Sequence, residues 1–238
     1  ADLDSITAFT SEFTDSYDEL HVLANNAGVM AIPRRETADG FEQQFGVNHL
    51  GHFALTGLLL ETLRDTPGDT RVVTQSSGLH ERGTIDFDDL HGERSYEKWD
   101  AYAQSKLANV LFAYELDRRL EAADASVRSI ACHPGYADTN LQRRGPEMEG
   151  SRLRLWMMTL ANRIAAQSAE RGALSLLYAA TEPGVPGGSY IGPGGLMNMR
   201  GAPIEQRSSD LSYDEAMATR LWRLSARQTG VEFDLPTP

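Results

Sequence analysis

Short apolar runs that end in turn residues alternate with longer stretches in which apolar residues recur at helical spacing. The runs predict buried strands near residues 21–26, 71–76, 126–132 and 188–192. Between the second and third of them, the stretch from Trp99 to Ala122 predicts a long helix. Strands that alternate with helices pair in parallel through crossover connections, so we expect an α/β fold with a parallel sheet.

Residues 140–167 interrupt this order, because they mix arginine with bulky apolar side chains such as Trp156 and Met157. Three interpretations stay open: ordinary core, a mobile amphipathic lid over an apolar ligand, or a helix on a membrane surface. No repeat or linker divides the remaining chain. We therefore expect one domain over residues 1–238, with a substrate-binding insert or lid at 140–167.

Composition and charge narrow the choice of partners and compartment. The formal charge of −12 is dispersed along the chain, which argues against nucleic acid and is typical of proteins from very salty cytoplasm. The chain shows neither a run of about eighteen apolar residues nor the pattern of a signal peptide, so a membrane protein is not expected. Its single cysteine, Cys132, lies in an apolar run and agrees with a reducing compartment. We expect an acidic cytoplasmic protein.

The stretch YAQSK places Tyr102 and Lys106 four residues apart in the long helix predicted from Trp99 to Ala122, so their side chains lie on one face. A tyrosine with a pKa of about 10 is protonated at neutral pH, and lowering that pKa by about three units requires roughly 4 kcal/mol of selective phenolate stabilisation. A close ammonium in a partly desolvated site can supply much of this. The pair therefore predicts proton transfer, with a serine hydroxyl at a strand end holding the substrate oxygen.

Four further motifs accompany this pair along the chain. They are NNAG at 25–28, VNHLGHF with Asn48, VVTQSS with Ser77, and HPGYADT at 133–139. Together with YAQSK, their order and spacing resemble the classical short-chain dehydrogenase/reductase family. The C-terminal stretches AERGALSLLYAATEP and AMATRLWRLSARQTG resemble the subgroup of retinol dehydrogenases and WW-domain oxidoreductases. The resemblance covers almost the whole chain and implies a Rossmann-like, doubly wound parallel sheet.

The resemblance also implies an activity: NAD(P)-dependent interconversion of an alcohol and a ketone or aldehyde, on a hydrophobic small molecule. Tyr102 would be the acid and base, and Lys106 would lower its pKa and bind the nicotinamide ribose. Ser77 would orient the substrate oxygen, and Asn48 would hold a helix bend and a water. The subgroup slightly favours NADP over NAD. Beyond Tyr102 and Lys106, the implied cofactor-binding residues are Asn25, Ala27, Gly28, Pro134, Gly135 and Thr139.

Two pairs of neighbouring residues allow other interpretations. Ser76 and Ser77 are adjacent, so the sequence leaves open which hydroxyl meets the substrate. His49 and His52 are three residues apart and could suggest a metal site. No third ligand is evident, and both histidines fall inside the VNHLGHF motif, so no metal is expected.

One family motif is missing from the sequence. The glycine-rich phosphate loop, of the form TGxxxGxG, does not occur, and only one acidic helix precedes the strand at 21–26. We expect an N-terminally truncated domain without the family's first three strands, whose open apolar edge favours association, including a homo-oligomer. The alternative function is a catalytically inactive domain that acts through binding or assembly.

Overall fold

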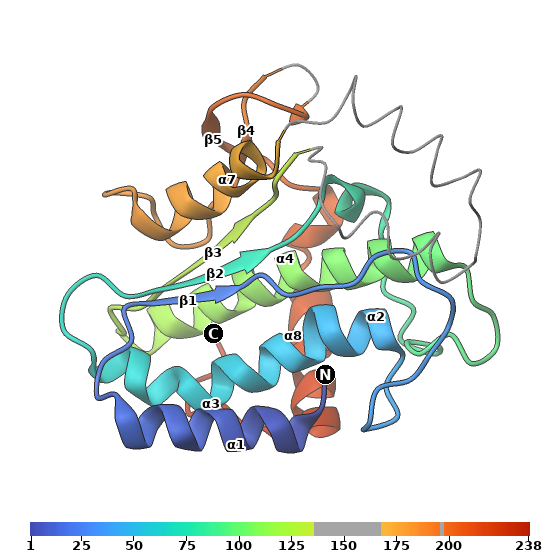
Figure 1. Ribbon diagram of the computed structural model, residues 1–238, viewed down its shortest axis with the longest axis horizontal. Coiled ribbons are helices and arrows are strands. Elements are labelled where there is room, and N and C mark those ends of the chain that lie inside the picture. Colours follow the sequence, from blue (N-terminus) through green and yellow to red (C-terminus); the bar gives the residue numbers. More distant parts are fainter. Residues whose placement is uncertain (136–167, 196–197) are drawn as a thin grey trace.

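The computed structural model describes residues 1–135, 168–195 and 198–238 (Figure 1). Within these ranges the strands form one mixed sheet with the order β1-β2-β3-β4-β5. Its strands are β1 (Val22–Asn25), β2 (Arg71–Gln75), β3 (Arg128–Cys132), β4 (Tyr190–Pro193) and β5 (Pro203–Gln206). The first four strands pair in parallel, and β5 pairs antiparallel with β4. The four predicted strands and their parallel pairing are confirmed, whereas β5 was not predicted.

Helices cover both faces of the sheet. Those that the structure describes are α1 (Leu3–Ser16), α2 (Gln43–Phe45), α3 (Gly51–Asp65), α4 (Lys98–Ala122), α7 (Ala169–Thr181) and α8 (Glu215–Thr229). Figure 1 shows α1, α3, α4 and α8 on one side of the strands and α7 on the other. The predicted α/β Rossmann-like fold is therefore confirmed, because helices on both faces of a parallel sheet are its defining arrangement.

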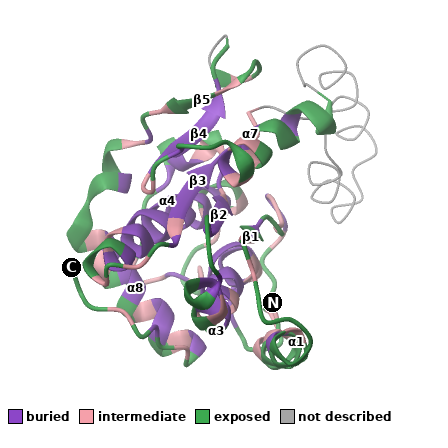
Figure 2. Cartoon of the chain, turned by 90° about the vertical axis from the view of Figure 1, so that its left-hand side faces the viewer, coloured by how far each residue is buried: buried purple, intermediate pink, exposed green. Residues whose placement is uncertain are grey.

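Helix α4 is the longest helix in the described ranges, with 25 residues. It begins where the carboxylate of Glu97 accepts hydrogen bonds from the backbone N–H groups of Trp99 and Asp100, at 2.8 and 3.0 Å. Every residue from 102 to 117 is buried, and Figure 2 shows this helix in the interior beside the strands, whereas α1 is largely exposed. The capping carboxylate thus fixes the start of the helix close to Tyr102.

An aromatic cluster packs α3, α4 and α8 together. The ring of Phe53 lies 5.1 Å from Trp222 and 5.6 Å from Phe112, measured between ring centroids. Next to this cluster, the buried carboxylate of Glu115 binds Arg119 at 2.7 Å, and the Arg119 guanidinium lies 4.4 Å from the Trp222 ring centroid. The second partner of Glu115, Arg118, binds at 2.5 Å. The charged groups of α4 are therefore neutralised where α8 covers the helix.

The proposed insert at 140–167, with Trp156, lies outside the described residues, as does Thr139. No helix in the described part of the chain combines the length and the apolar character needed to cross a bilayer.

Candidate functional site

The end of β2 and helix α4 are joined by three hydrogen bonds at the centre of the candidate site. Lys106 Nζ donates to the carbonyl oxygen of Gln75 at 3.0 Å, and Asn109 Nδ2 donates to the same oxygen at 2.9 Å. Ser76 Oγ donates to the carbonyl oxygen of Lys106 at 2.7 Å. Lys106 is only 3 % exposed, so its ammonium is held in a largely water-free position.

The two adjacent serines differ in their surroundings. Ser76 is buried and its hydroxyl is used by the bond to α4, whereas Ser77 is half-buried. Ser77 Oγ accepts a hydrogen bond from the backbone N–H of Leu79 at 3.3 Å and also interacts with the phenol of Tyr102. The Ser77 hydroxyl is therefore the one that faces Tyr102.

Burial shifts the pKa values of the Tyr102 and Lys106 pair in opposite directions. It raises the pKa of Tyr102 to about 12, against a smaller lowering by the hydrogen bond to Ser77. It lowers the pKa of Lys106 to about 8. The Lys106 Nζ atom lies 5.8 Å from the centroid of the Tyr102 ring. Each shift favours the neutral form of its own group, because both lie away from water.

Asn48 lies in a π-helical turn, Gly46–Leu50, between α2 and α3. Its side chain is fixed at both ends: Oδ1 accepts from the backbone N–H of Val29 at 2.8 Å, and Nδ2 donates to the Val29 carbonyl and to Ser105 Oγ, both at 2.9 Å. A Cβ atom on Gly28 would lie 3.0 Å from Asn48 Oδ1 and 3.8 Å from Lys106 Nζ. Glycine at position 28 therefore allows the backbone to approach these two polar groups closely.

The two histidines of the same region have protein partners. His49 Nε2 lies 2.7 Å from Ser225 Oγ of α8, and His52 Nδ1 donates to the carbonyl oxygen of Asn48 at 2.9 Å. Burial lowers the pKa of His49 to about 3 and that of His52 to about 4. The described residues contain no group of three histidine, cysteine or acidic side chains arranged for a metal ion.

The remaining described residues of the NNAG and HPGYADT motifs, up to Gly135, lie near the same edge of the sheet but differ in exposure. Asn25 is buried and donates from Nδ2 to Thr56 Oγ1 of α3 at 2.9 Å, so its side chain is turned inward. Ala27 is exposed. Pro134 and Gly135 follow β3, and Gly135 has a φ of +68°, a conformation that favours glycine.

Trp99, which the sequence motifs do not include, marks the outer rim of the site. Its ring is 45 % exposed and lies 6.5 Å from the Tyr102 ring in an edge-to-face arrangement. No periodicity distinguishes this residue in the sequence. It is the second residue of α4, and its backbone N–H donates to the capping carboxylate of Glu97.

The sequence and the fold both resemble those of known proteins. The family model for short chain dehydrogenases matches residues 1–150, which is more than half of the chain. The chain belongs to the short-chain dehydrogenase family. It spans about two thirds of the length of the curated relatives that it matches. Human polyprenol dehydrogenase is 38 % identical over 238 residues, which cover 97 % of this chain and 67 % of the relative. Human retinol dehydrogenase 14 is 39 % identical, with coverage of 97 % and 65 %.

Two solved structures have the same fold as this short-chain dehydrogenase. An uncharacterised protein from Mycobacterium paratuberculosis is 41 % identical and superimposes with a TM-score of 0.77, over 98 % of this chain and 74 % of the other. The aldohexose dehydrogenase of Thermoplasma acidophilum has a TM-score of 0.58 over 79 % of this chain and 71 % of its own, at 18 % identity. The second likeness concerns the fold alone.

The described part of the site fits the nicotinamide end of NAD(P), the cofactor class of short-chain dehydrogenases. At Gly28 the backbone lies close to the amide oxygen of Asn48 and to the ammonium of Lys106. An ammonium has three N–H donors, and within the described residues Lys106 donates one hydrogen bond, to Gln75, which leaves donors for ribose hydroxyls. Which of NAD and NADP binds depends on the adenosine end.

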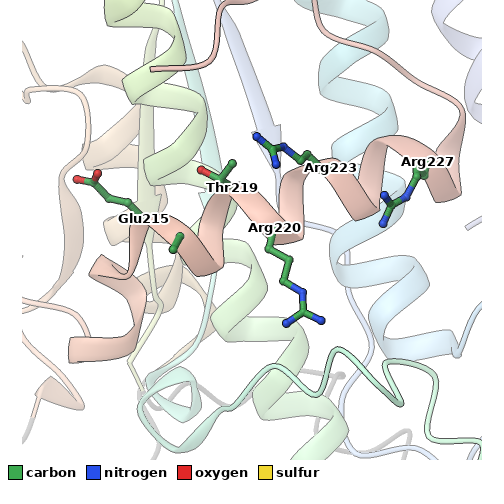
Figure 3. A pocket seen from close by; sticks show the side chains of 6 residues that line it. Glu215, Thr219, Arg220, Arg223 and Arg227 are labelled. Carbon is green, nitrogen blue, oxygen red and sulfur yellow. The ribbon is translucent and has the colours of Figure 1, made fainter.

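A separate hollow of about 560 Å³ lies on the outer face of α8. Its lining residues are Glu215, Ala216, Thr219, Arg220, Arg223 and Arg227. Figure 3 shows Arg220 and Arg223 pointing to opposite sides of the helix, so the arginines do not converge on one point. None of the residues expected to be catalytic lines this hollow.

Proposed function

We propose that this chain carries the catalytic part of an NAD(P)-dependent oxidoreductase that interconverts an alcohol and a ketone or aldehyde. The observation that carries the proposal is the buried pair of Tyr102 and Lys106 with the Ser77 hydroxyl facing the phenol. Ser77 is the substrate-orienting serine and Ser76 is structural. The family match and the relatives named as dehydrogenases support the same reaction class.

Each residue has a defined part in the reaction. Ser77 Oγ donates a hydrogen bond to the substrate oxygen and holds it beside the phenol. Tyr102 accepts the hydroxyl proton during oxidation and returns it during reduction. Lys106 stabilises the phenolate through its positive charge, and its ammonium binds ribose hydroxyls. A bound oxidised nicotinamide supplies the hydride acceptor and a further positive charge. Asn48 holds its π-helical turn against the backbone of Val29, next to Gly28 and the Lys106 ammonium.

The pKa of Tyr102 implies that the proposed reaction requires a bound oxidised nicotinamide. Burial raises this pKa to about 12 against a smaller lowering by the hydrogen bond to Ser77, so these residues by themselves keep the phenol protonated at neutral pH. Lowering it toward 7 requires about 7 kcal/mol of selective phenolate stabilisation. Two positive charges in a water-free site supply energies of this size.

The substrate is proposed to be a hydrophobic alcohol or its carbonyl counterpart. Two relatives are named for polyprenol and retinol, both apolar alcohols. The exposed face of Trp99 beside Tyr102 offers an apolar surface at the rim of the site. The segment 140–167, with Trp156, is proposed to complete the substrate site.

The test is Tyr102→Phe in the intact protein, measured as NADP- and NAD-linked oxidation of retinol and of a short polyprenol. Loss of the phenol proton should lower kcat by about 10²- to 10⁴-fold. Tyr114→Phe is the matched control, because Tyr114 is a second buried tyrosine of α4 whose hydroxyl binds Ser208 away from the site. Undiminished turnover in Tyr102→Phe would overturn the proposal.

A further inference from the structure

Two turns flank the candidate site, and each is held by a buried histidine. The first turn, which contains Ser77, is held by His80: its Nδ1 donates to the Ser77 carbonyl oxygen at 2.8 Å. The second turn, Pro134–Gly135, is held by His133, whose Nδ1 accepts from the Gly135 N–H at 3.3 Å. Both histidines are nearly inaccessible, at 1 % and 4 % exposure.

The hydrogen bonds define a neutral form for each ring. A carbonyl oxygen can only accept, so His80 carries its proton on Nδ1, and its Nε2 accepts from the Ser209 N–H at 3.0 Å. His133 carries its proton on Nε2, which lies 3.2 Å from Gln206 Oε1. Burial lowers the pKa of His133 to about 4 and also lowers that of His80, so both rings are neutral near pH 7. The two rings are fixed hydrogen-bonding elements.

The same two rings pack on Tyr190 of β4. The centroid of the His133 ring lies 5.2 Å from that of Tyr190 with an interplanar angle of 11°, and the centroid of the His80 ring lies 5.0 Å away. The Tyr190 hydroxyl oxygen lies 3.2 Å from His80 Nδ1, where it shares the proton given to Ser77. Tyr190 is 2 % exposed. One aromatic ring therefore contacts both of the histidines that hold the site's turns.

The neighbouring backbone leaves this arrangement little freedom. A Cβ on Gly192 would overlap His133 Nε2, so only glycine fits beside that ring. A Cβ on Gly135 would lie 2.5 Å from the carbonyl oxygen of Met199, closer than such contacts allow. A shift of Tyr190 would therefore displace the histidines instead of being absorbed by loose packing.

We propose that Tyr190 is a positioning residue that couples the Ser77 turn to the Pro134–Gly135 turn through His80 and His133. The inference rests on the proposed function, in which Ser77 holds the substrate oxygen and the second turn borders the nicotinamide. Transfer of hydride and proton requires both partners to be aligned together, and a displacement of about 1 Å costs on the order of 10²-fold in rate. One residue that holds both turns sets their relative position.

The test is reciprocal and uses amide hydrogen exchange of this chain, without cofactor or substrate. His133→Leu should accelerate exchange about 10-fold in residues 76–80, which it does not touch, and His80→Leu should do the same in residues 133–135. Tyr190→Leu should accelerate both segments, while Tyr190→Phe keeps the ring and should leave residues 133–135 unchanged. His21→Leu, at an exposed position, is the control.

The proposal fails if His133→Leu accelerates exchange only in residues 133–135, if His80→Leu does so only in residues 76–80, or if Tyr190→Leu accelerates only one of the two segments. Any one of these three variants that folds is sufficient for the test. In the intact protein, Tyr190→Leu should lower kcat and raise KM for substrate and cofactor together, with partial recovery in Tyr190→Phe. If Tyr102→Phe remained fully active, the proposed function would fail while the exchange result still decided the coupling. The two failures are therefore distinguishable.

Discussion

Helices α4 and α8 are packed against each other, yet they use polar residues in opposite ways. Along α4, every residue from 102 to 117 is buried, including the polar ones, and Lys106 and Glu115 each have a specific partner. Along α8, one face carries the buried Leu221 and Trp222, and the other carries arginines that line an open hollow.

The contrast teaches which polar residues indicate function. A charge on an exposed helix face costs little to keep, so the arginines of α8 require no special role. A charge buried inside α4 costs several kcal/mol of desolvation unless it is paired or bonded. Lys106 bears this cost at the end of β2, with its Nζ atom 5.8 Å from the Tyr102 ring centroid, where we propose that its ammonium assists proton transfer. The hollow on α8 is therefore a weaker guide to the reaction than a buried lysine.

The largest effect is expected from removing the buried ammonium. Lys106→Met keeps the length of the side chain but removes the charge, so kcat should fall by about 10²- to 10⁴-fold in the intact protein. Lys98→Met, which changes the only other lysine of the chain and lies on the same helix, should keep its activity. Steady-state kinetics of the two variants, with circular dichroism to verify folding, measure the difference. Equal activities of the two variants would contradict the proposed role of the Lys106 ammonium in proton transfer.

The next effect concerns the ion pairs that Glu115 forms within α4, on the part of the helix that α8 covers. Glu115→Gln leaves the buried guanidinium of Arg119 without its carboxylate, so the free energy of unfolding should fall by about 3 kcal/mol. Urea denaturation monitored by far-UV circular dichroism measures this loss. Asp210→Asn breaks an exposed pair with Arg207 and should leave the midpoint unchanged. A Glu115→Gln protein as stable as the wild type would show that α4 tolerates an unpaired charge.

Mild acid should loosen the contact between α4 and α8. His49 lies between Phe112 of α4 and Ser225 of α8, and burial lowers the pKa values of His49, His52 and His133 to about 3, 4 and 4. In the unfolded chain these histidines titrate near pH 6.5, so the unfolded state binds more protons than the native state between about pH 6.5 and pH 4. The free energy of unfolding therefore falls as the pH falls through this range. Each histidine should cost about 1 kcal/mol at pH 5.5.

One buried carboxyl acts against this trend. Burial raises the pKa of Asp117 to about 6, so the native state keeps a proton that the unfolded chain has already released, and this contribution falls as pH rises. The three histidines outweigh it. Urea midpoints at pH 7.5 and 5.5 test the sign, and His49→Gln should flatten the dependence. A midpoint that rises on acidification would contradict the assignment of neutral buried histidines.

The smallest effect is expected on α8. Arg223→Gln removes a charge from the outer face, where its guanidinium lines the open hollow, so stability should change by less than about 0.5 kcal/mol and turnover should stay the same. Thermal unfolding and steady-state kinetics of this variant measure the effect of an exposed charge on α8, for comparison with the buried charges of α4. A large loss of activity would give the hollow a catalytic role that its geometry does not suggest.

The strands and the long helix α4 could be predicted because their signals are local. Strands β1 to β4 are short apolar runs, and α4 shows helical periodicity over its whole length. Strand β5 escaped prediction because its four residues begin with a proline, are only partly buried and pair antiparallel. The π-helical turn at Gly46–Leu50 leaves no trace in the pattern either, since a single widened turn does not change the periodicity.

The candidate site divides in the same way. Tyr102 and Lys106 are four residues apart on one helix, so their common face follows from spacing alone. The contact between His80 and Tyr190 joins residues far apart in sequence, and the stack of His133 on Tyr190 depends on the pairing of β3 with β4. A single sequence contains no signal for such contacts, because they depend on strand order and register. The roles of the predicted site residues remain predictions until the variants are measured.

The position of Trp99 has a practical consequence for spectroscopy. Its indole is open to solvent and stands edge-to-face with Tyr102, whereas the indole of Trp222 is enclosed by aromatic rings. In a Trp156→Phe variant, which removes the third tryptophan of the chain, intrinsic emission therefore contains one component that senses the medium around the candidate site and another that senses the state of the core. Quenching by iodide, with and without nicotinamide nucleotide, separates the two components, and protection of Trp99 gives a label-free measure of ligand binding.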